Sequence, residues 1–147
     1  MATPKPRRKP AEAPAAGRRP KREPMSRVDT AWLRMERPTN PMMITGVLMF
    51  AEPMSLAQLK RVIQKRFLAY RRFLQKPVEG AAGASWVEDE TFDLDWHVRL
   101  SGLPGKGGKV SDKRALERFV SQLASSPLDP TKPLWQFHLI ERFQGGS

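Results

Sequence analysis

Apolar and polar residues alternate along the segment from Asp93 to Leu100. One face of this segment would carry Leu94, Trp96, Val98 and Leu100, and the other face would carry Asp93, Asp95, His97 and Arg99. A period of two that includes an aromatic and a β-branched residue predicts a strand with one buried face. Because His97 falls on the polar face, we expect an exposed strand histidine there.

Three other segments have the residue pattern of strands. Ile44–Phe50 is apolar on both faces and lies between Pro41 and Pro53, which predicts a buried strand. Ser85–Glu88 predicts a short strand, and in Leu134–Glu141 aromatic and aliphatic residues alternate with polar ones. Together with the helices described below, these strands predict an α+β fold, and their order is that of a split βαβ arrangement.

Helical periodicity is strongest from Ser55 to Leu74. Ser55 and Gln58 have the spacing of a capping box at its start. The apolar stripe of this helix consists of Leu56, Leu59, Val62, Ile63, Phe67, Tyr70 and Leu74. Ser111–Ser125 predicts a second amphipathic helix.

A shorter helix is predicted to begin at Ser26. Ser26 and Asp29 have capping-box spacing, with Asp in place of the usual Glu, and Pro38 ends the helix. We expect this helix to lay Trp32 on the sheet.

The formal net charge of the 147-residue chain is +11, and more than half of it lies in residues 1–24. This segment has eight Lys or Arg residues against two Glu residues, and no large apolar residue after Met1. Such a segment cannot bury enough apolar surface to offset the entropy of ordering it, so we predict a disordered basic tail rich in Pro, Ala, Lys and Arg. Residues 25–147 then form the folded part.

The polar side of the long helix carries six basic residues and no acidic one: Lys60, Arg61, Lys65, Arg66, Arg71 and Arg72. Cations without counter-charges repel one another unless an anion lies nearby. A run of charge is usually a solvated helix face, and that is the ordinary expectation here. The alternative is contact with an anionic membrane surface or with the phosphates of coenzyme A.

The composition excludes several kinds of chemistry. The chain has no cysteine, so it has no disulfide, no thiolate nucleophile and no cysteine-bound metal. No apolar run reaches the roughly 18 residues that a membrane-spanning helix needs.

Three groups of residues, in this order and spacing, resemble one enzyme family. They are Met25–Trp32 with Asn40–Met42, Phe92–Arg99 with Leu103–Pro104, and Ser126–Asp129 with Lys132–Trp135. Together they are similar to the N-terminal portion of the bacterial wax ester synthase/diacylglycerol O-acyltransferase family.

The resemblance implies a fatty acyl transfer from acyl-CoA to diacylglycerol or a long-chain alcohol, with a histidine as general base on the acceptor hydroxyl. Acyl-CoA is then a substrate, and no metal or redox cofactor is implied. The implied fold is the first part of the coenzyme A-dependent, chloramphenicol acetyltransferase-like fold, in which helices cover a mixed sheet. Pro133, Leu134 and Trp135 would support the catalytic centre, and Asp29 would lie near the active-site channel.

The chain departs from this family at the base itself, which belongs to a His-His-x-x-x-Asp-Gly motif. Its two histidines, His97 and His138, are not part of such a motif. We therefore expect residues 25–147 to be the N-terminal part of an acyltransferase domain that ends before this motif. We expect no catalytic residue in this part, and no activity without a C-terminal portion. The expected location is cytoplasmic, peripheral to the inner membrane or to lipid inclusions.

Two non-catalytic alternatives remain. The order of elements and the basic excess are also found in RNA-recognition domains, but Gly46–Phe50 lacks the basic residue and the paired aromatics of their signature. Nucleic acid is therefore not the expected partner. The second alternative is a module that only adheres to membranes.

Overall fold

Two small sheets organise the part of the chain that the computed structural model describes, which is residues 22–103, 113–141, 143 and 147. The first sheet is antiparallel with strand order β1-β3-β2, and the second pairs β4 and β5 in parallel. The strands are β1 (Arg22–Pro24), β2 (Gln75–Gly80), β3 (Gly83–Glu88), β4 (Val98–Leu100) and β5 (Phe137–Leu139).

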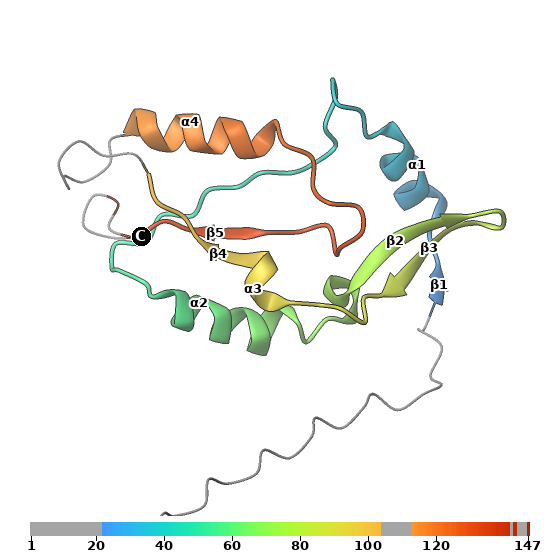
Figure 1. Cartoon of the computed structure of the whole chain (residues 1–147), viewed down its shortest axis with the longest axis horizontal. Helices are drawn as coiled ribbons and strands as arrows, with labels where there is room; N and C mark the ends of the chain where they lie inside the picture. The colour runs from blue at the N-terminus through green and yellow to red at the C-terminus, as the bar shows by residue number, and fades with distance from the viewer. Residues whose placement is uncertain (1–21, 104–112, 142, 144–146) are drawn as a thin grey trace, which may run out of the picture.

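The helices lie around these sheets. They are α1 (Arg27–Met35), α2 (Leu56–Val62), the π-helical turn η1 (Ile63–Phe67), the 3₁₀ turn η2 (Arg71–Leu74), α3 (Leu94–His97) and α4 (Lys113–Ala124). Figure 1 shows the β4–β5 pair between α4 and α2, with the antiparallel sheet at the other end of the molecule beside α1. Helices and sheets occur together as the sequence predicts, but the described strands form two sheets and no split βαβ unit.

The start of α2 is the predicted capping box. Ser55 Oγ accepts a hydrogen bond from the Gln58 amide at 3.2 Å, and Gln58 Oε1 accepts one from the Ser55 amide at 2.8 Å. The helix does not continue regularly to Leu74, because the Leu68 amide donates to the Ile63 carbonyl and widens the turn. This wide turn leaves Tyr70 exposed, although the sequence placed it on the apolar stripe.

Strands β2 and β3 form a hairpin that is longer than the predicted strand Ser85–Glu88. Their register runs from the pair Gln75 and Glu88 to the pair Gly80 and Gly83. Gly83 has a φ of +108°, a region that favours glycine, and it closes the tight turn. The hairpin leads directly to Asp89 and so fixes where the following loop begins.

The prediction of a strand from Asp93 to Leu100 is wrong for its first half. Asp93 Oδ1 accepts a hydrogen bond from the Asp95 amide at 2.9 Å, and the side chain thereby starts the short helix α3. Only Val98–Leu100 is a strand. The turn of α3 rotates His97 inward, so this side chain is 0% exposed and not the surface histidine that alternation suggests.

The predicted buried strand Ile44–Phe50 is also wrong. The segment has no strand assignment, and Ile44 is 97% and Leu48 75% exposed. Apolar composition alone cannot make a strand, because the ladder needs a neighbour with free backbone groups. Trp32 is likewise 54% exposed and does not lie buried on a sheet.

The prediction of a disordered tail over residues 1–24 is wrong for its last three residues. Arg22–Pro24 is strand β1 and pairs with β3, so that Glu23 faces Trp86. Residues 1–21 lie outside the described part of the chain. Backbone pairing orders these three residues in spite of their polarity.

Candidate functional site

Trp135 contacts several aromatic rings and two polar groups from distant parts of the chain. Its indole Nε1–H donates to the Phe73 carbonyl at 2.8 Å, and its own carbonyl lies 2.7 Å from His97 Nδ1. The ring meets Phe67 edge-on at 5.0 Å. Pro133, two residues earlier, is among the most deeply buried side chains. These contacts fix the chain immediately before β5.

His97 is held as one defined tautomer. A carbonyl oxygen can only accept, so Nδ1 carries the proton that is donated to Trp135. The imidazole is stacked on Trp135 at 4.2 Å and on Phe92 at 5.0 Å. Its Nε2 is buried without a hydrogen-bond partner. Burial lowers the pKa of His97, and the bond to the Trp135 carbonyl offsets this only in part.

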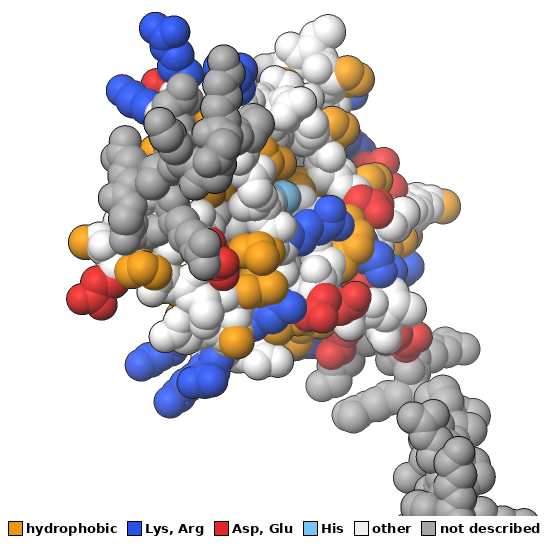
Figure 2. Space-filling view, turned by 60° about the vertical axis from the view of Figure 1, so that its left-hand side comes forward, with side chains coloured by type: hydrophobic (Ala, Val, Ile, Leu, Met, Phe, Trp, Pro, Cys, Tyr) orange, Lys and Arg blue, Asp and Glu red, His pale blue; other side chains and the backbone are white. Residues whose placement is uncertain are grey.

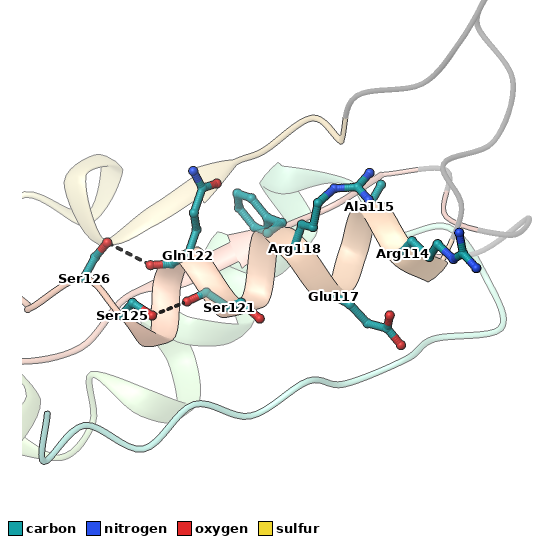
Figure 3. A pocket seen from close by; sticks show the side chains of 9 residues that line it. Arg114, Ala115, Glu117, Arg118, Ser121, Gln122, Ser125 and Ser126 are labelled. Atoms are coloured by element: carbon teal, nitrogen blue, oxygen red, sulfur yellow. Dashed lines mark hydrogen bonds between the residues drawn. The ribbon is translucent and has the colours of Figure 1, made fainter. Parts of the chain in front are cut away.

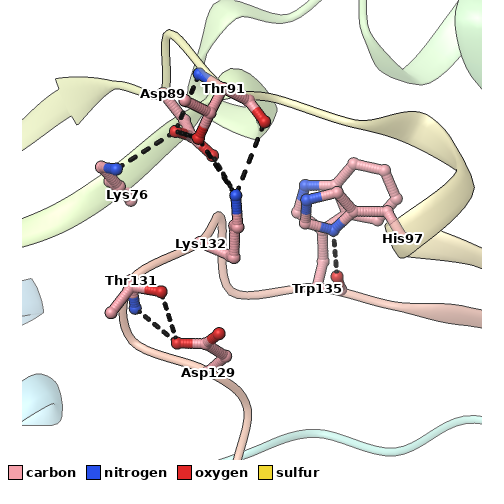
Figure 4. Close-up of polar contacts among 8 residues, drawn as sticks. All are labelled: Lys76, Asp89, Thr91, His97, Asp129, Thr131, Lys132 and Trp135. Atoms are coloured by element: carbon pink, nitrogen blue, oxygen red, sulfur yellow. Dashed lines mark hydrogen bonds and ion pairs between the residues drawn. The ribbon is translucent and has the colours of Figure 1, made fainter.

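Asp89 anchors the loop between β3 and α3 (Figure 4). Its Oδ1 accepts hydrogen bonds from Lys76 Nζ at 3.1 Å and from the Thr91 amide and hydroxyl at 3.2 and 2.9 Å. Lys132 Nζ lies 3.8 Å from Oδ2 and also donates to the Thr91 hydroxyl at 3.1 Å. Burial alone would raise the pKa of Asp89, but the hydrogen bonds from Lys76 and Thr91 outweigh it and lower the pKa.

A second carboxylate organises the bend before Lys132. The Thr131 hydroxyl and amide donate to Asp129 Oδ1 at 2.7 and 2.8 Å, and these bonds lower the pKa of Asp129. Figure 4 shows this turn below the Asp89 cluster, on the same stretch of chain that leads to Trp135. The bend therefore brings Lys132 to Asp89 and Trp135 to His97 at the same time.

The imidazole of His97 is closed to a substrate. The free lone pair of His97 Nε2 is enclosed, because the residue has no exposed surface. The other histidine, His138, is hydrogen-bonded to Ser101 Oγ at 3.0 Å and lies near Gln136 Oε1. Burial lowers its pKa as well. His97 Nε2 is thus enclosed, and His138 meets the Ser101 hydroxyl and the Gln136 side-chain oxygen.

The structure brings some predicted site residues together and leaves one apart. Trp135 lies within the cluster just described, Pro133 is deeply buried beside it, and Leu134 between them is half-buried. Asp29 is exposed in the first turn of α1, where its amide donates to Ser26 Oγ. Sequence reasoning missed Asp89 and Lys76. Their signal was weak, since a lone acid after a strand is common on protein surfaces.

The six basic residues of the long helix divide into two groups. Lys60 pairs with Asp95 at 2.7 Å, Arg71 with Glu23 at 2.6 Å, and Arg72 with Glu23 at 3.5 Å. The view that these cations lack counter-charges is therefore wrong for half of them, because β1 and α3 supply the acids. The side chains that meet no carboxylate in the described part of the chain are Arg61, Lys65 and Arg66. Figure 2 shows basic side chains both beside acidic ones and apart from them.

An open hollow runs along one side of α4. Its lining consists of Arg114, Ala115, Glu117, Arg118, Phe119, Ser121, Gln122, Ser125 and Ser126. Figure 3 shows Ser125 and Ser126 turned back to the helix, where their hydroxyls donate to the carbonyls of Ser121 and Gln122 at 2.8 Å. The described residues contain no group of three or more acidic or histidine side chains that could hold a metal ion. This hollow offers no catalytic set of side chains.

Among the described residues, we find no helix whose length and apolar character would let it cross a membrane.

Comparison with known proteins identifies relatives of this arrangement. Residues 25–147 match the family model described as wax ester synthase/diacylglycerol acyltransferase catalytic domain. A probable diacylglycerol O-acyltransferase of Mycobacterium tuberculosis, tgs3, is 32% identical over 123 residues. The solved wax ester synthase/diacylglycerol acyltransferase from Marinobacter aquaeolei VT8 matches with a TM-score of 0.66 and 31% identity.

The chain spans less than half the length of these relatives. The match covers 80% of this chain and 44% of tgs3. For the Marinobacter structure it covers 83% of this chain and 30% of that one.

The buried neutral imidazole gives a pH dependence of stability. Because burial holds the pKa of His97 below the ordinary 6.5, the unfolded chain binds a proton near that pH that the folded protein does not bind. Stability should therefore fall as the pH drops below about 7, by up to about 1.4 kcal/mol per pH unit for each such histidine. Urea unfolding at a series of pH values measures this slope. The series runs from about 7.5 to about 5.5, which is about one unit on each side of the ordinary histidine pKa of about 6.5.

The matched variant is His97→Asn, whose side-chain amide can still donate to the Trp135 carbonyl. Its free energy of unfolding should depend less on pH than that of the unaltered protein. The remaining slope should shrink further in combination with His138→Asn, because burial lowers the pKa of His138 too. Equal slopes in the unaltered protein and in His97→Asn would contradict this assignment.

Removal of the Asp89 charge should destabilise the fold. In Asp89→Asn, Lys76 and Lys132 lose their common carboxylate, although both are partly exposed and can be rehydrated. We expect a loss of about 2 to 3 kcal/mol in the free energy of unfolding. The control is Asp95→Asn, whose 74% exposed side chain should change stability by less than about 1 kcal/mol. Equal effects of the two substitutions in chemical denaturation would refute a special role of Asp89.

Proposed function

This chain belongs to the wax ester synthase/diacylglycerol acyltransferase family, and from that membership we propose that the protein takes part in fatty acyl transfer from acyl-CoA. The proposed acceptor is the hydroxyl of diacylglycerol or of a long-chain alcohol, and the product is triacylglycerol or a wax ester. The observation that carries the proposal is the family match over residues 25–147, supported by 31% identity and a TM-score of 0.66 to the Marinobacter enzyme.

The proposed reaction is a direct displacement at the thioester. A general base removes the proton of the acceptor hydroxyl, and the oxygen forms the new ester bond with the acyl carbon. The bond between this carbon and sulfur breaks, and the base returns the proton to the sulfur so that coenzyme A leaves as the thiol. In the family resemblance this base is the histidine of the His-His-x-x-x-Asp-Gly motif. His97 and His138 do not lie in such a motif, and His97 has no exposed surface. We therefore assign no catalytic residue within the 147 residues.

The role we propose for the described region is support. Trp135, fixed through its carbonyl and its indole, sets the position and direction of β5 relative to β4. Pro133 and Leu134 belong to the same fixed segment. We propose that these residues support the catalytic centre of the assembled fold. Asp29, exposed on α1, stays our candidate for a residue beside the channel.

Transplantation into a relative tests this function. Residues 25–147 of this chain replace the matched 123 residues of tgs3, and release of coenzyme A thiol is measured with palmitoyl-CoA and a diacylglycerol or hexadecanol. We expect acyl transfer by the chimaera and no thiol release by the 147-residue polypeptide alone. A soluble, folded chimaera without activity would count against the proposed function, and turnover by the isolated polypeptide would refute the assignment of no base.

The substitution Trp135→Ala in the chimaera tests whether Trp135 supports the catalytic centre. Loss of the indole hydrogen bond to the Phe73 carbonyl and of the stacking on His97 should lower acyl transfer at least about tenfold, because a small displacement near a catalytic centre is costly. The control is Trp32→Ala, a substitution of the same kind at a side chain that is 54% exposed. It should leave the rate nearly unchanged.

We also propose that the protein is peripheral to the inner membrane or to lipid inclusions, through a basic patch formed by Arg61, Lys65 and Arg66. These exposed side chains meet no carboxylate in the described part of the chain. On an anionic surface each Lys or Arg contributes about 1 kcal/mol at best. The acyl acceptor is itself a lipid, so adhesion would bring the protein to its substrate.

Binding to vesicles tests the patch. Replacement of Arg61, Lys65 and Arg66 together by Gln should weaken binding to vesicles that contain phosphatidylserine by up to about a hundredfold at low salt. The control replaces Lys60, Arg71 and Arg72 by Gln, which removes the same charge from residues that already face carboxylates. Equal losses in the two variants, measured by co-sedimentation, would show that net charge alone governs binding.

A further inference from the structure

The side chain of His97 is buried although the proposed reaction gives it no chemistry. It has no exposed surface, and its Nε2 meets no hydrogen-bond partner among the described residues. A buried polar atom without a partner costs free energy that an apolar side chain of the same shape would avoid. Packing alone therefore does not account for an imidazole at this position, and the contact of its other nitrogen does.

That other ring nitrogen fixes a peptide plane. Nδ1 donates to the Trp135 carbonyl at 2.7 Å, and this carbonyl belongs to the planar unit that joins Trp135 to Gln136. The Trp135 amide is held as well, because it donates to the Pro133 carbonyl at 2.8 Å in a three-residue turn. Figure 4 shows the bond from His97 reaching the segment that carries Lys132 and Trp135. Both backbone groups of Trp135 are thereby oriented before the chain enters β5.

The imidazole is itself held in one orientation. Its ring is stacked on Phe92 at 5.0 Å with 16° between the planes, and on Trp135 at 4.2 Å with 25°. Rotation of the ring about its side-chain bonds would break both contacts, so Nδ1 stays aimed at the carbonyl. Helix α3 adds to this, because Asp93 caps its first turn and His97 is its last residue. His97 is thus a fixed donor.

His97 and Val98 together set the register of β5 against β4. The side chain of His97 meets Trp135, and the next residue, Val98, is the partner of Phe137 in the parallel pair. The hydrogen bonds of a parallel pair are evenly spaced, and a slip of two residues would keep every side chain on its face. Backbone pairing alone therefore does not select this register. The bond from His97 does, because it reaches one particular carbonyl.

We propose that His97 is a positioning residue for acyl transfer, which acts through the backbone of Trp135. Its Nδ1–H sets the register of β5 on β4 and the direction of the segment Pro133–Trp135, which would support the catalytic centre. His97 itself touches no substrate, because its ring is enclosed. This inference rests on the proposed function, but the hold of His97 on Trp135 can be measured without activity.

Two substitutions in the chimaera separate the N–H from the ring. His97→Asn keeps a donor near the position of Nδ1 and loses the aromatic ring, whereas His97→Phe keeps a ring and loses the donor. We expect His97→Phe to lower kcat at least about tenfold and to change KM for palmitoyl-CoA less than about twofold, because the catalytic centre is displaced while substrate binding is kept. His97→Asn should keep kcat within about threefold of the unaltered chimaera.

A side chain that only fills space would give the opposite order. Phe fills the site better than Asn and removes the buried Nε2, so the urea midpoint of the whole chain with His97→Phe should be no lower than with His97→Asn. The slower variant is then at least as stable as the faster one. Equal kcat in His97→Phe and the unaltered chimaera, or an equal loss in both variants, would overturn the proposal. Rates that follow the order of stability would overturn it as well.

The matched control is Trp86→Phe in the chimaera. It removes another buried nitrogen without a hydrogen-bond partner among the described residues, on strand β3. Because β3 belongs to the antiparallel sheet and not to the β4–β5 pair, kcat should stay within about twofold. A loss as large as that of His97→Phe would mean that any altered buried ring slows the reaction, and it would overturn the assignment to His97.

Hydrogen exchange in the whole chain tests the same bond without activity. The Trp135 indole N–H donates to the Phe73 carbonyl at 2.8 Å, and local opening of the segment exposes it to exchange. His97→Phe should speed this exchange at least about tenfold, and His97→Asn less than about threefold. Equal exchange in the two variants would overturn the proposal. An unaltered chimaera without activity would count against the proposed function alone, and exchange would still decide whether His97 holds Trp135.

Discussion

The described structure depends on how Trp135 is held. Its carbonyl accepts from His97 and its indole donates to the Phe73 carbonyl, so one residue joins α3, the turn η2 and the start of β5. Each bond contributes about 1 kcal/mol, and each aromatic contact adds about 0.5 to 1.5 kcal/mol beyond burial. These sums are small, but the three elements come from distant parts of the sequence. Without this residue, no other described hydrogen bond would tie them together at one point.

Local signals in the sequence predicted those elements that depend on neighbours in the chain. Ser55 and Gln58 form their capping box because both partners lie in one turn. Ser26 caps α1 for the same reason. The alternation after Asp93 misled because the side chain of Asp93 caps a short helix whose last residue, His97, is buried. Side chains such as Asp offer the backbone a local hydrogen bond that competes with strand pairing, and alternation alone does not show this competition.

What could not be predicted depends on partners far away in the sequence. The cations of the long helix seemed unpaired because Glu23 and Asp95 approach only after folding. The role of Asp89 was hidden in the same way, since Lys132 comes from a distant bend. The family motif at Pro133–Trp135 did point to the cluster, but not to the histidine beneath it. Periodicity shows which face is apolar, and only the fold shows what meets it.

The contacts of Trp135 also constrain the β4–β5 pair. Trp135 fixes the entry to β5, and β5 is held against β4 by parallel pairing that extends to the bond from the Ser101 amide to the Leu139 carbonyl. A displacement of Trp135 would therefore be felt first in this parallel pairing, where Val98 lies opposite Phe137 and Leu100 opposite Leu139. Because Val98 and Leu139 are among the few fully buried apolar side chains of the described residues, the hold on Trp135 also fixes part of the core.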